Sequence, residues 1–96
     1  MTTETLTVWK FQPRIADVAV VEMPKGARIL RAGIQGVTFC VWALVDPKAP
    51  MAERRIRIAG TGHDIAPSHT ETYVNTFEMN GGALVFHVFD LGEDRF

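Results

Sequence analysis

Turn-forming residues interrupt this chain at short, regular intervals, and this spacing limits the length of any element between them. The interruptions are clusters of glycine, proline, asparagine and aspartate at 12–13, 24–26, 35–36, 46–50, 60–62 and 80–82. The runs between them are rich in Val, Ile, Phe, Thr and Trp, which favour extended backbone. Short β-prone segments between regular turns are typical of an all-β sandwich or barrel.

We therefore predict a single all-β domain over residues 1–96, a small antiparallel sandwich or partly open barrel of about six or seven strands. The expected strands are 4–11, 17–23, 27–34, 37–45, 53–60, 72–79 and 83–90. A chain of this length buries roughly 60–70% of its unfolded surface, enough for one modest core. Residues 15–23 also fit one face of a short helix, but their β-branched residues and the following Pro24 favour a strand.

Two hairpins are signalled, at Gln35-Gly36 and at Asn80-Gly81, because these pairs accept the backbone of tight turns. Gly82 leaves two registers open for the second hairpin. A two-residue loop would place Phe77 opposite Leu84 and Val74 opposite His87.

A three-residue loop would instead place Phe77 opposite Val85 and Asn75 opposite His87. We favour this second register because it gathers most of the large apolar residues on one face and gives His87 a hydrogen-bond partner in Asn75. The residues that would share this face are Tyr73, Phe77, Met79, Val85 and Phe89.

The expected strands 37–45 and 83–90 are apolar on both faces, whereas a free-standing two-layer sandwich normally has one polar face per strand. A second subunit would cover the extra apolar face, so we expect a homo-oligomer, with a dimer favoured. A tightly curled barrel covered by its own loops is the alternative. The expected interface residues are Phe39, Val41, Trp42, Leu84, Phe86 and Val88.

The stretch GTGHDIAPSH, at 60–69, is the main candidate for chemistry. The simplest interpretation is a glycine-shaped turn after the strand 53–60. Two sharper hypotheses remain. Backbone N–H groups of Gly60, Thr61, Gly62, His63 and Asp64 could bind an anionic ligand. Alternatively, His63, His69 and His87 could hold a metal ion, with Asp64 outside them.

Other signals of a catalytic site are weak. Ser68 lies outside any nucleophile motif, and its neighbour His69 would point to the opposite side of an extended chain. Cys40 lies in an apolar run, where a buried and inert thiol is the usual case. Arg55 and Arg57 alternate with isoleucines and indicate a solvated strand face. We therefore expect no enzyme and no cofactor.

The formal net charge of −1 lacks the basic excess of nucleic-acid-binding proteins, so we expect no nucleic-acid partner. The longest apolar run, FCVWALV at 39–45, is too short to cross a bilayer. The start, MTTETLTVWK, lacks the basic and apolar regions of a signal peptide. These features predict a protein of a reducing cytoplasm that does not bind membranes.

Several local stretches together resemble a family of small, uncharacterised proteins of tailed bacteriophages, especially those of actinobacteria, and of related prophages. They are WKF at 9–11, MPKGARIL at 23–30, WALVDPKAP at 42–50, GTGHDI at 60–65 and GGALVFHVF at 81–89. The family carries a domain of unknown function. The resemblance therefore implies a phage origin and the host cytoplasm, but it implies no reaction and no catalytic residue.

The leading functional hypothesis is a non-enzymatic phage accessory protein that binds a host or phage protein in the infected cell. The first alternative is a small-ligand or metal-binding protein or enzyme that uses the GTGHD loop with His69 and His87. The second alternative is a minor virion or assembly component.

Overall fold

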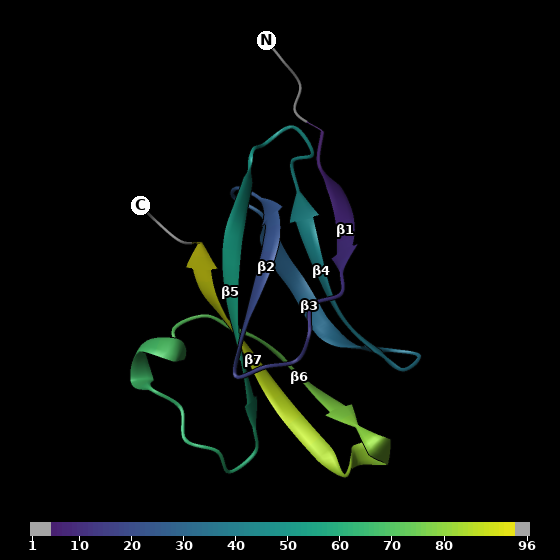
Figure 1. Ribbon diagram of the computed structural model, residues 1–96, viewed down its shortest axis with the longest axis vertical. Coiled ribbons are helices and arrows are strands. Elements are labelled where there is room, and N and C mark those ends of the chain that lie inside the picture. Colours follow the sequence, from purple (N-terminus) through teal and green to yellow (C-terminus); the bar gives the residue numbers. More distant parts are fainter. Residues whose placement is uncertain (1–4, 94–96) are drawn as a thin grey trace.

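Strands dominate the computed structural model, which describes residues 5–93 (Figure 1). In that range the chain contains no α-helix, and two 3₁₀ turns, Pro67–His69 and Asn80–Gly82, are its only helical segments. The strands are β1 (Thr7–Phe11), β2 (Val18–Pro24), β3 (Arg28–Gln35), β4 (Thr38–Val45), β5 (Met51–Gly60), β6 (Tyr73–Met79) and β7 (Leu84–Glu93).

The strands form two antiparallel sheets, one of three strands in the order β1-β4-β3 and one of four in the order β2-β5-β7-β6. The sheets form a sandwich and do not close into a barrel. The predicted all-β fold with seven strands is confirmed, and residues 18–24 form a strand and not the alternative helix. β5 begins at Met51, earlier than expected, because Met51 and Ala52 pair with the end of β2.

The core lies between the two sheets and consists of side chains that alternate along the strands, as half-buried strands require. Phe77 is central to it, with its ring centroid 5.3 Å from that of Phe39 and 5.4 Å from that of Phe86. The buried apolar cluster comprises Ala19, Val21, Met23, Ala27, Ala32, Phe39, Val41, Ala43, Val45, Ile56, Ile58, Phe77 and Val88.

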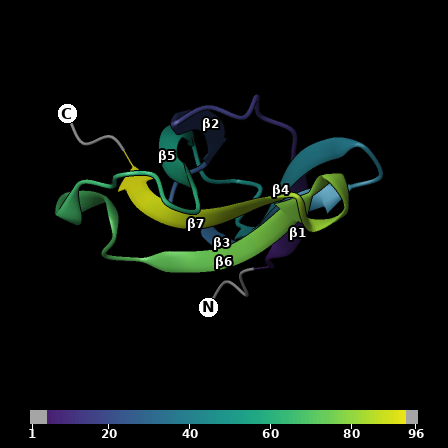
Figure 2. The same cartoon turned by 90° about the horizontal axis from the view of Figure 1, so that it is seen from below.

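Asn75 joins the two sheets where their outer strands β3 and β6 lie side by side (Figures 1 and 2). Its amide Nδ2 donates to the Ala32 carbonyl at 2.7 Å, and its Oδ1 accepts from the Ala32 N–H at 2.8 Å. The side chain thus imitates a neighbouring strand and satisfies both backbone groups of a fully buried residue. Asn75 is therefore not the partner of His87, and that prediction is wrong.

The first hairpin turns one residue later than expected. Gln35 pairs with Thr38, so the two turn residues are Gly36, with φ +64°, and Val37. Val37 is 97% exposed at the tip and does not belong to the strand that the sequence predicted to begin there. Cys40 has no exposed surface, as expected.

Both registers considered for the second hairpin are wrong. Phe77 faces Phe86, and Met79 faces Leu84, so the loop spans the four residues 80–83. Three successive positive φ values, at Asn80, Gly81 and Gly82, make this longer turn. Asparagine and glycine tolerate that left-handed backbone, which is why the Asn-Gly-Gly sequence signals a turn without fixing its length.

The register change also redistributes the side chains between the two faces. The pairing of β6 with β7 shifts between Tyr73 and Asn75, which marks a β-bulge. Phe77 and Met79 therefore pack with the core, whereas Tyr73 lies with Phe89 on the other face, their ring centroids 5.7 Å apart. The predicted single apolar face does not form.

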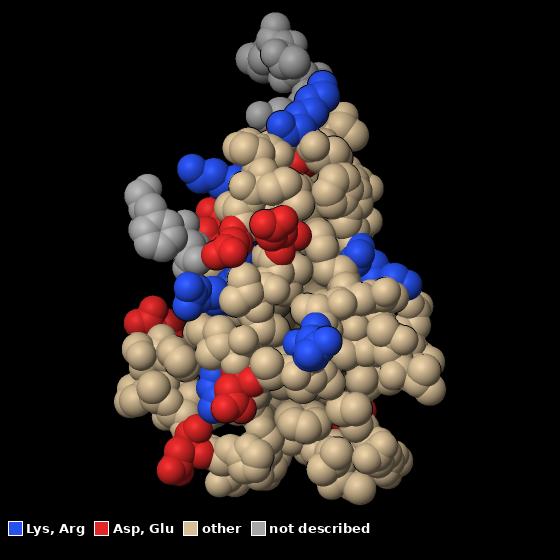
Figure 3. Space-filling view, viewed as in Figure 1, with Lys and Arg blue, Asp and Glu red and all other residues tan. Residues whose placement is uncertain are grey.

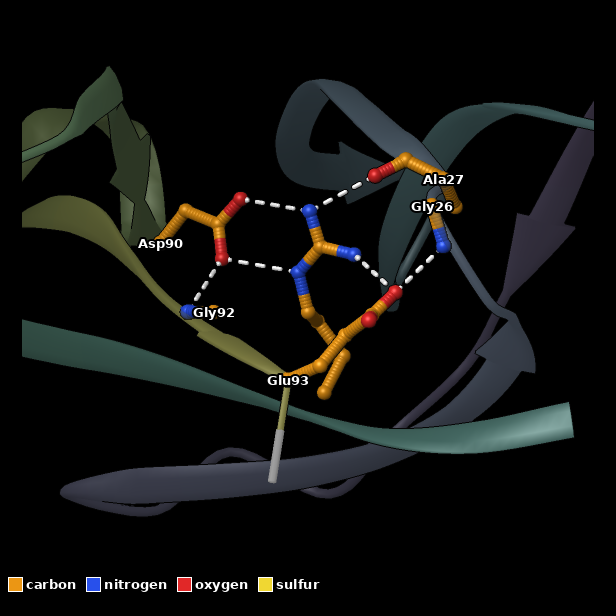
Figure 4. A network of polar contacts seen from close by, with 6 residues as sticks. Gly26, Ala27, Asp90, Gly92 and Glu93 are labelled. Atoms are coloured by element: carbon orange, nitrogen blue, oxygen red, sulfur yellow. Dashed lines mark hydrogen bonds and ion pairs between the residues drawn. The ribbon is translucent and has the colours of Figure 1, made fainter. Parts of the chain in front are cut away.

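Arg54 extends from the core-facing side of β5 and is only 9% exposed. Its guanidinium makes a double contact with Asp90 of β7, Nε to Oδ1 and Nη2 to Oδ2, each at 3.0 Å (Figure 4). Nη2 also donates to the Ala27 carbonyl at 2.6 Å, and Nη1 lies 3.5 Å from Glu93 Oε1. Glu93 in turn accepts from the Gly26 N–H.

This network connects β5, β7 and the turn between β2 and β3 through hydrogen bonds and ion pairs. A buried charge is stable only when it is paired and its hydrogen bonds are satisfied. In residues 5–93 no buried side-chain nitrogen or oxygen lacks a partner.

Replacement of Arg54 by methionine is expected to lower the free energy of unfolding by about 3–5 kcal/mol, because Asp90 and the Ala27 carbonyl would stay buried without their cation. Urea unfolding followed by circular dichroism measures the loss. The matched control is Arg28→Met on the exposed start of β3, where we expect a change within about 0.5 kcal/mol. Equal losses in the two variants would contradict the assigned role of Arg54.

Candidate functional site

The candidate site forms where the turn after β5 meets the first half of β7. The turn closes through the His63 N–H, which donates to the Gly60 carbonyl at 3.0 Å, and Gly62 takes φ +89°. Gly60 lies against the His63 ring, and a Cβ built there would be 3.0 Å from the ring carbon Cε1. Glycines at these two positions thus shape the turn, as the simplest interpretation of GTGH predicted.

Thr61 attaches this turn to β7. Its N–H donates to the Val85 carbonyl at 3.0 Å. The N–H groups of Thr61 and His63 are both used within the protein, so neither is available for the predicted anion-binding loop. The Asp64 carbonyl, and not its carboxylate, makes the structural contact of that residue.

Arg57 binds the segment that follows this turn, at Asp64. Its Nη2 donates to the Asp64 carbonyl at 3.0 Å, and its Nη1 donates to the carbonyls of Asp17 and Ile58 at 3.1 and 2.9 Å. Arg57 does lie opposite the isoleucine face, as predicted, but it is only 8% exposed. The prediction of a solvated arginine face is therefore wrong at this position, because the loop after β5 covers the guanidinium.

His87, in β7, is the polar centre of the site. Its Nε2 lies 2.7 Å from Thr61 Oγ1, and its Nδ1 lies 2.9 Å from Oγ1 of Thr76, the residue that faces it across the hairpin. Thr76 Oγ1 is also 2.7 Å from the Tyr73 hydroxyl. A chain of hydrogen bonds therefore runs from the exposed Tyr73 through His87 to the turn after β5.

A depression of about 250 Å³ opens beside this chain. Thr61 and His63 form its polar part, and the beginning of β7 supplies its apolar part. The lining residues are Gly60, Thr61, His63, Ala83, Leu84, Val85 and Phe86. A second depression, of about 240 Å³, lies beside the Arg54 network.

The three histidines do not form the predicted metal site. In the described part of the chain, no three histidine, cysteine or carboxylate side chains come together in a way that could hold a metal ion. Both ring nitrogens of His87 are bonded to threonine hydroxyls, His63 packs on Gly60, and His69 lies in the 3₁₀ turn Pro67–His69.

The residues expected at an oligomer interface divide into two groups. Phe39, Val41 and Val88 are 6, 0 and 0% exposed and pack in the core of the single chain, so they cannot reach a second subunit. Trp42, Leu84 and Phe86 retain exposed surface.

Charged side chains of both signs are scattered over the face shown in Figure 3, with broad uncharged areas between them. In the described range, no helix is long and apolar enough to cross a membrane.

Comparison with known proteins gives a family but no activity. The model of a family described as a domain of unknown function, DUF7352, matches residues 4–95. The chain belongs to the DUF7352 family. No curated protein and no solved structure matches it. The family match covers the GTGH turn and His87 of this DUF7352 domain but assigns neither of them a role.

The sequence did not reveal the partners of His87. Thr61 lies in a motif that already attracted attention, but Thr76 and Tyr73 carry no motif of their own. Only the pairing of β6 with β7 places Thr76 opposite His87.

Replacement of Arg57 by leucine is expected to loosen residues 61–66, because the Asp64 carbonyl would lose its buried partner. Amide hydrogen exchange in this segment should accelerate, while the total loss of stability stays near 1–3 kcal/mol. Mass spectrometry of deuterium uptake measures both the segment and, as an internal control, the distant β3–β4 hairpin. Uniform acceleration over the whole chain would contradict a local role for Arg57.

Proposed function

We propose that this DUF7352 domain is a phage-encoded accessory protein that binds a host or phage protein in the cytoplasm of the infected cell, and that it acts by binding rather than by substrate turnover. The resemblance of its sequence to proteins of tailed phages supports the origin. The open edge of β1 supports the mode of action, and it is the observation that carries the proposal.

β1 is the outermost strand of the three-stranded sheet and pairs, in the described chain, with β4 alone. Its apolar side chains are unusually accessible, since Val8 is 50% exposed and Trp9 is 37% exposed. Val8 faces Leu44, and Lys10 faces Trp42, so both cross-strand neighbours on this face are apolar and partly exposed. The edge of β1 is thus continuous with a patch of apolar surface.

An edge strand offers unpaired N–H and C=O groups to which another protein can add a strand. Proteins usually block such edges with charges, prolines or bulges. β1 has a single charged residue, Lys10, and contains neither proline nor bulge. β2, at the edge of the other sheet, contains Glu22 and ends at Pro24. β1 is therefore the better-suited edge for adding a partner strand.

The substitution Val8→Lys is expected to abolish capture of a specific partner from a lysate of infected cells, because it adds a second charge to the edge. The matched control is Val37→Lys at the exposed hairpin tip, which should capture the partner as the wild type does. Affinity capture with quantitative mass spectrometry compares the three proteins, and thermal unfolding verifies that each is folded. Retention of the partner by Val8→Lys would contradict the proposal.

The second candidate function of the β1 edge is the formation of a homodimer. When two β1 strands pair antiparallel around Trp9, Lys10 of one copy faces Val8 of the other, so no like charges meet. The pairing would extend the three-stranded sheet into one continuous sheet across both copies.

In this arrangement the two Trp9 residues lie opposite each other, so Trp9→Cys is expected to form a disulfide-linked dimer rapidly under mild oxidation. Directly opposed strand residues have Cα atoms about 4.5–5.5 Å apart, a range that a disulfide can span. The fully buried Cys40 does not compete. Non-reducing electrophoresis measures the rate, with Val37→Cys as control. Equal rates, together with a monomer in sedimentation of the wild type, would exclude this dimer.

A further inference from the structure

We propose that Thr61 is a nucleophilic hydroxyl, activated by His87, that accepts an acyl group from an activated ester. This reactivity does not depend on the binding function proposed above. A nucleophile next to a base, which is itself oriented by a third group, is the arrangement common to acyl-transfer sites. Thr61, His87 and Thr76 occupy these three positions.

One tautomer of His87 gives this group the hydrogen bonds that a nucleophile and its base require. Thr61 Oγ1 lies 2.7 Å from His87 Nε2 but 3.3 Å from the Val85 carbonyl, which already accepts the Thr61 N–H. In the neutral tautomer that carries its proton on Nδ1, the Nε2 atom accepts from the Thr61 hydroxyl, as the attack requires.

In the same tautomer, Nδ1–H donates to Thr76 Oγ1, which lies 2.9 Å away. Thr76 Oγ1 is also 2.7 Å from the Tyr73 hydroxyl. In the proposal Thr76 is a positioning residue that holds the proton on Nδ1 and leaves Nε2 free to act as a base.

The surroundings leave Thr61 open to a small acyl donor. Thr61 is exposed and the space beside Gly62 is empty, so a small electrophile can approach the hydroxyl. The apolar part of the depression of about 250 Å³, along Leu84 and Phe86, lies on the opposite face of β7 from His87, so a small acyl donor reaches the hydroxyl from solvent.

In the proposed step, Thr61 Oγ1 attacks the carbonyl carbon of an aryl ester while its proton passes to His87 Nε2. The bond from that carbon to the aryl oxygen then breaks, and the phenol leaves with the proton from Nε2. The products are an acyl-threonine ester and a free phenol, and His87 returns to its initial protonation state.

The purified full chain is treated with p-nitrophenyl acetate, and the acetylated residue is located by peptide mass spectrometry. We expect acetyl at Thr61, loss of this adduct in Thr61→Val, and retention in Thr61→Ser. The variant His87→Gln keeps hydrogen-bonding groups but lacks the base, so acetylation at position 61 should slow by about 100-fold. The matched control Thr70→Val removes an exposed hydroxyl that bonds only the Pro67 carbonyl, and should leave the rate unchanged.

Thermal unfolding of each variant shows which of them are folded. If Thr61→Val does not fold, the two single variants Thr61→Ser and His87→Gln still test the proposal, because the first should keep the adduct and the second should slow its formation. Acetylation confined to lysines, or a rate at Thr61 that His87→Gln does not change, would overturn the proposal. Because the assay uses the free protein, its failure would leave the binding function untouched. Loss of partner capture in Val8→Lys would likewise say nothing about Thr61.

Discussion

The buried charge of Arg54 is the constraint on which the arrangement of this domain depends. Arg54 is only 9% exposed, so its guanidinium requires acceptors within the protein, and they come from β7 and from the turn between β2 and β3. These segments are far apart in sequence, so the ion pairs fix how β7 lies on β5. A slip of β7 along β5 would also separate the buried Arg54 from Asp90 and leave both charges unpaired, which is costly.

The geometry of the candidate site depends on this alignment of β7 with β5. β7 carries both the Asp90 that binds Arg54 and the His87 that binds Thr61, and β5 ends in the turn that contains Thr61. A shift of β7 by one residue would turn His87 to the other face of the sheet. The alignment of β7 that pairs Asp90 with Arg54 therefore also places the His87 ring at hydrogen-bonding distance from the Thr61 hydroxyl.

The sequence predicted the strands of the fold better than the contacts of the candidate site. The seven strands could be located because turn residues and β-branched runs are local signals, and the buried state of Cys40 followed from its apolar neighbours. The last hairpin could not be aligned, since Asn-Gly-Gly permits loops of several lengths and the bulge near Val74 carries no sequence mark. The loop length alone, four residues in place of three, gave His87 the wrong partner, Asn75 in place of Thr76.

The sequence by itself determined the all-β class, the positions of the strands and the glycine-shaped turn at Gly60–Gly62, because each depends on backbone preferences within a few residues. Only the tertiary structure decided that Arg57 is covered, that Asn75 joins the sheets and that Thr61 meets His87. Each of these contacts joins residues whose pairing depends on strand register and sheet order. Those are set by the packing of the whole core and leave no local trace in the chain.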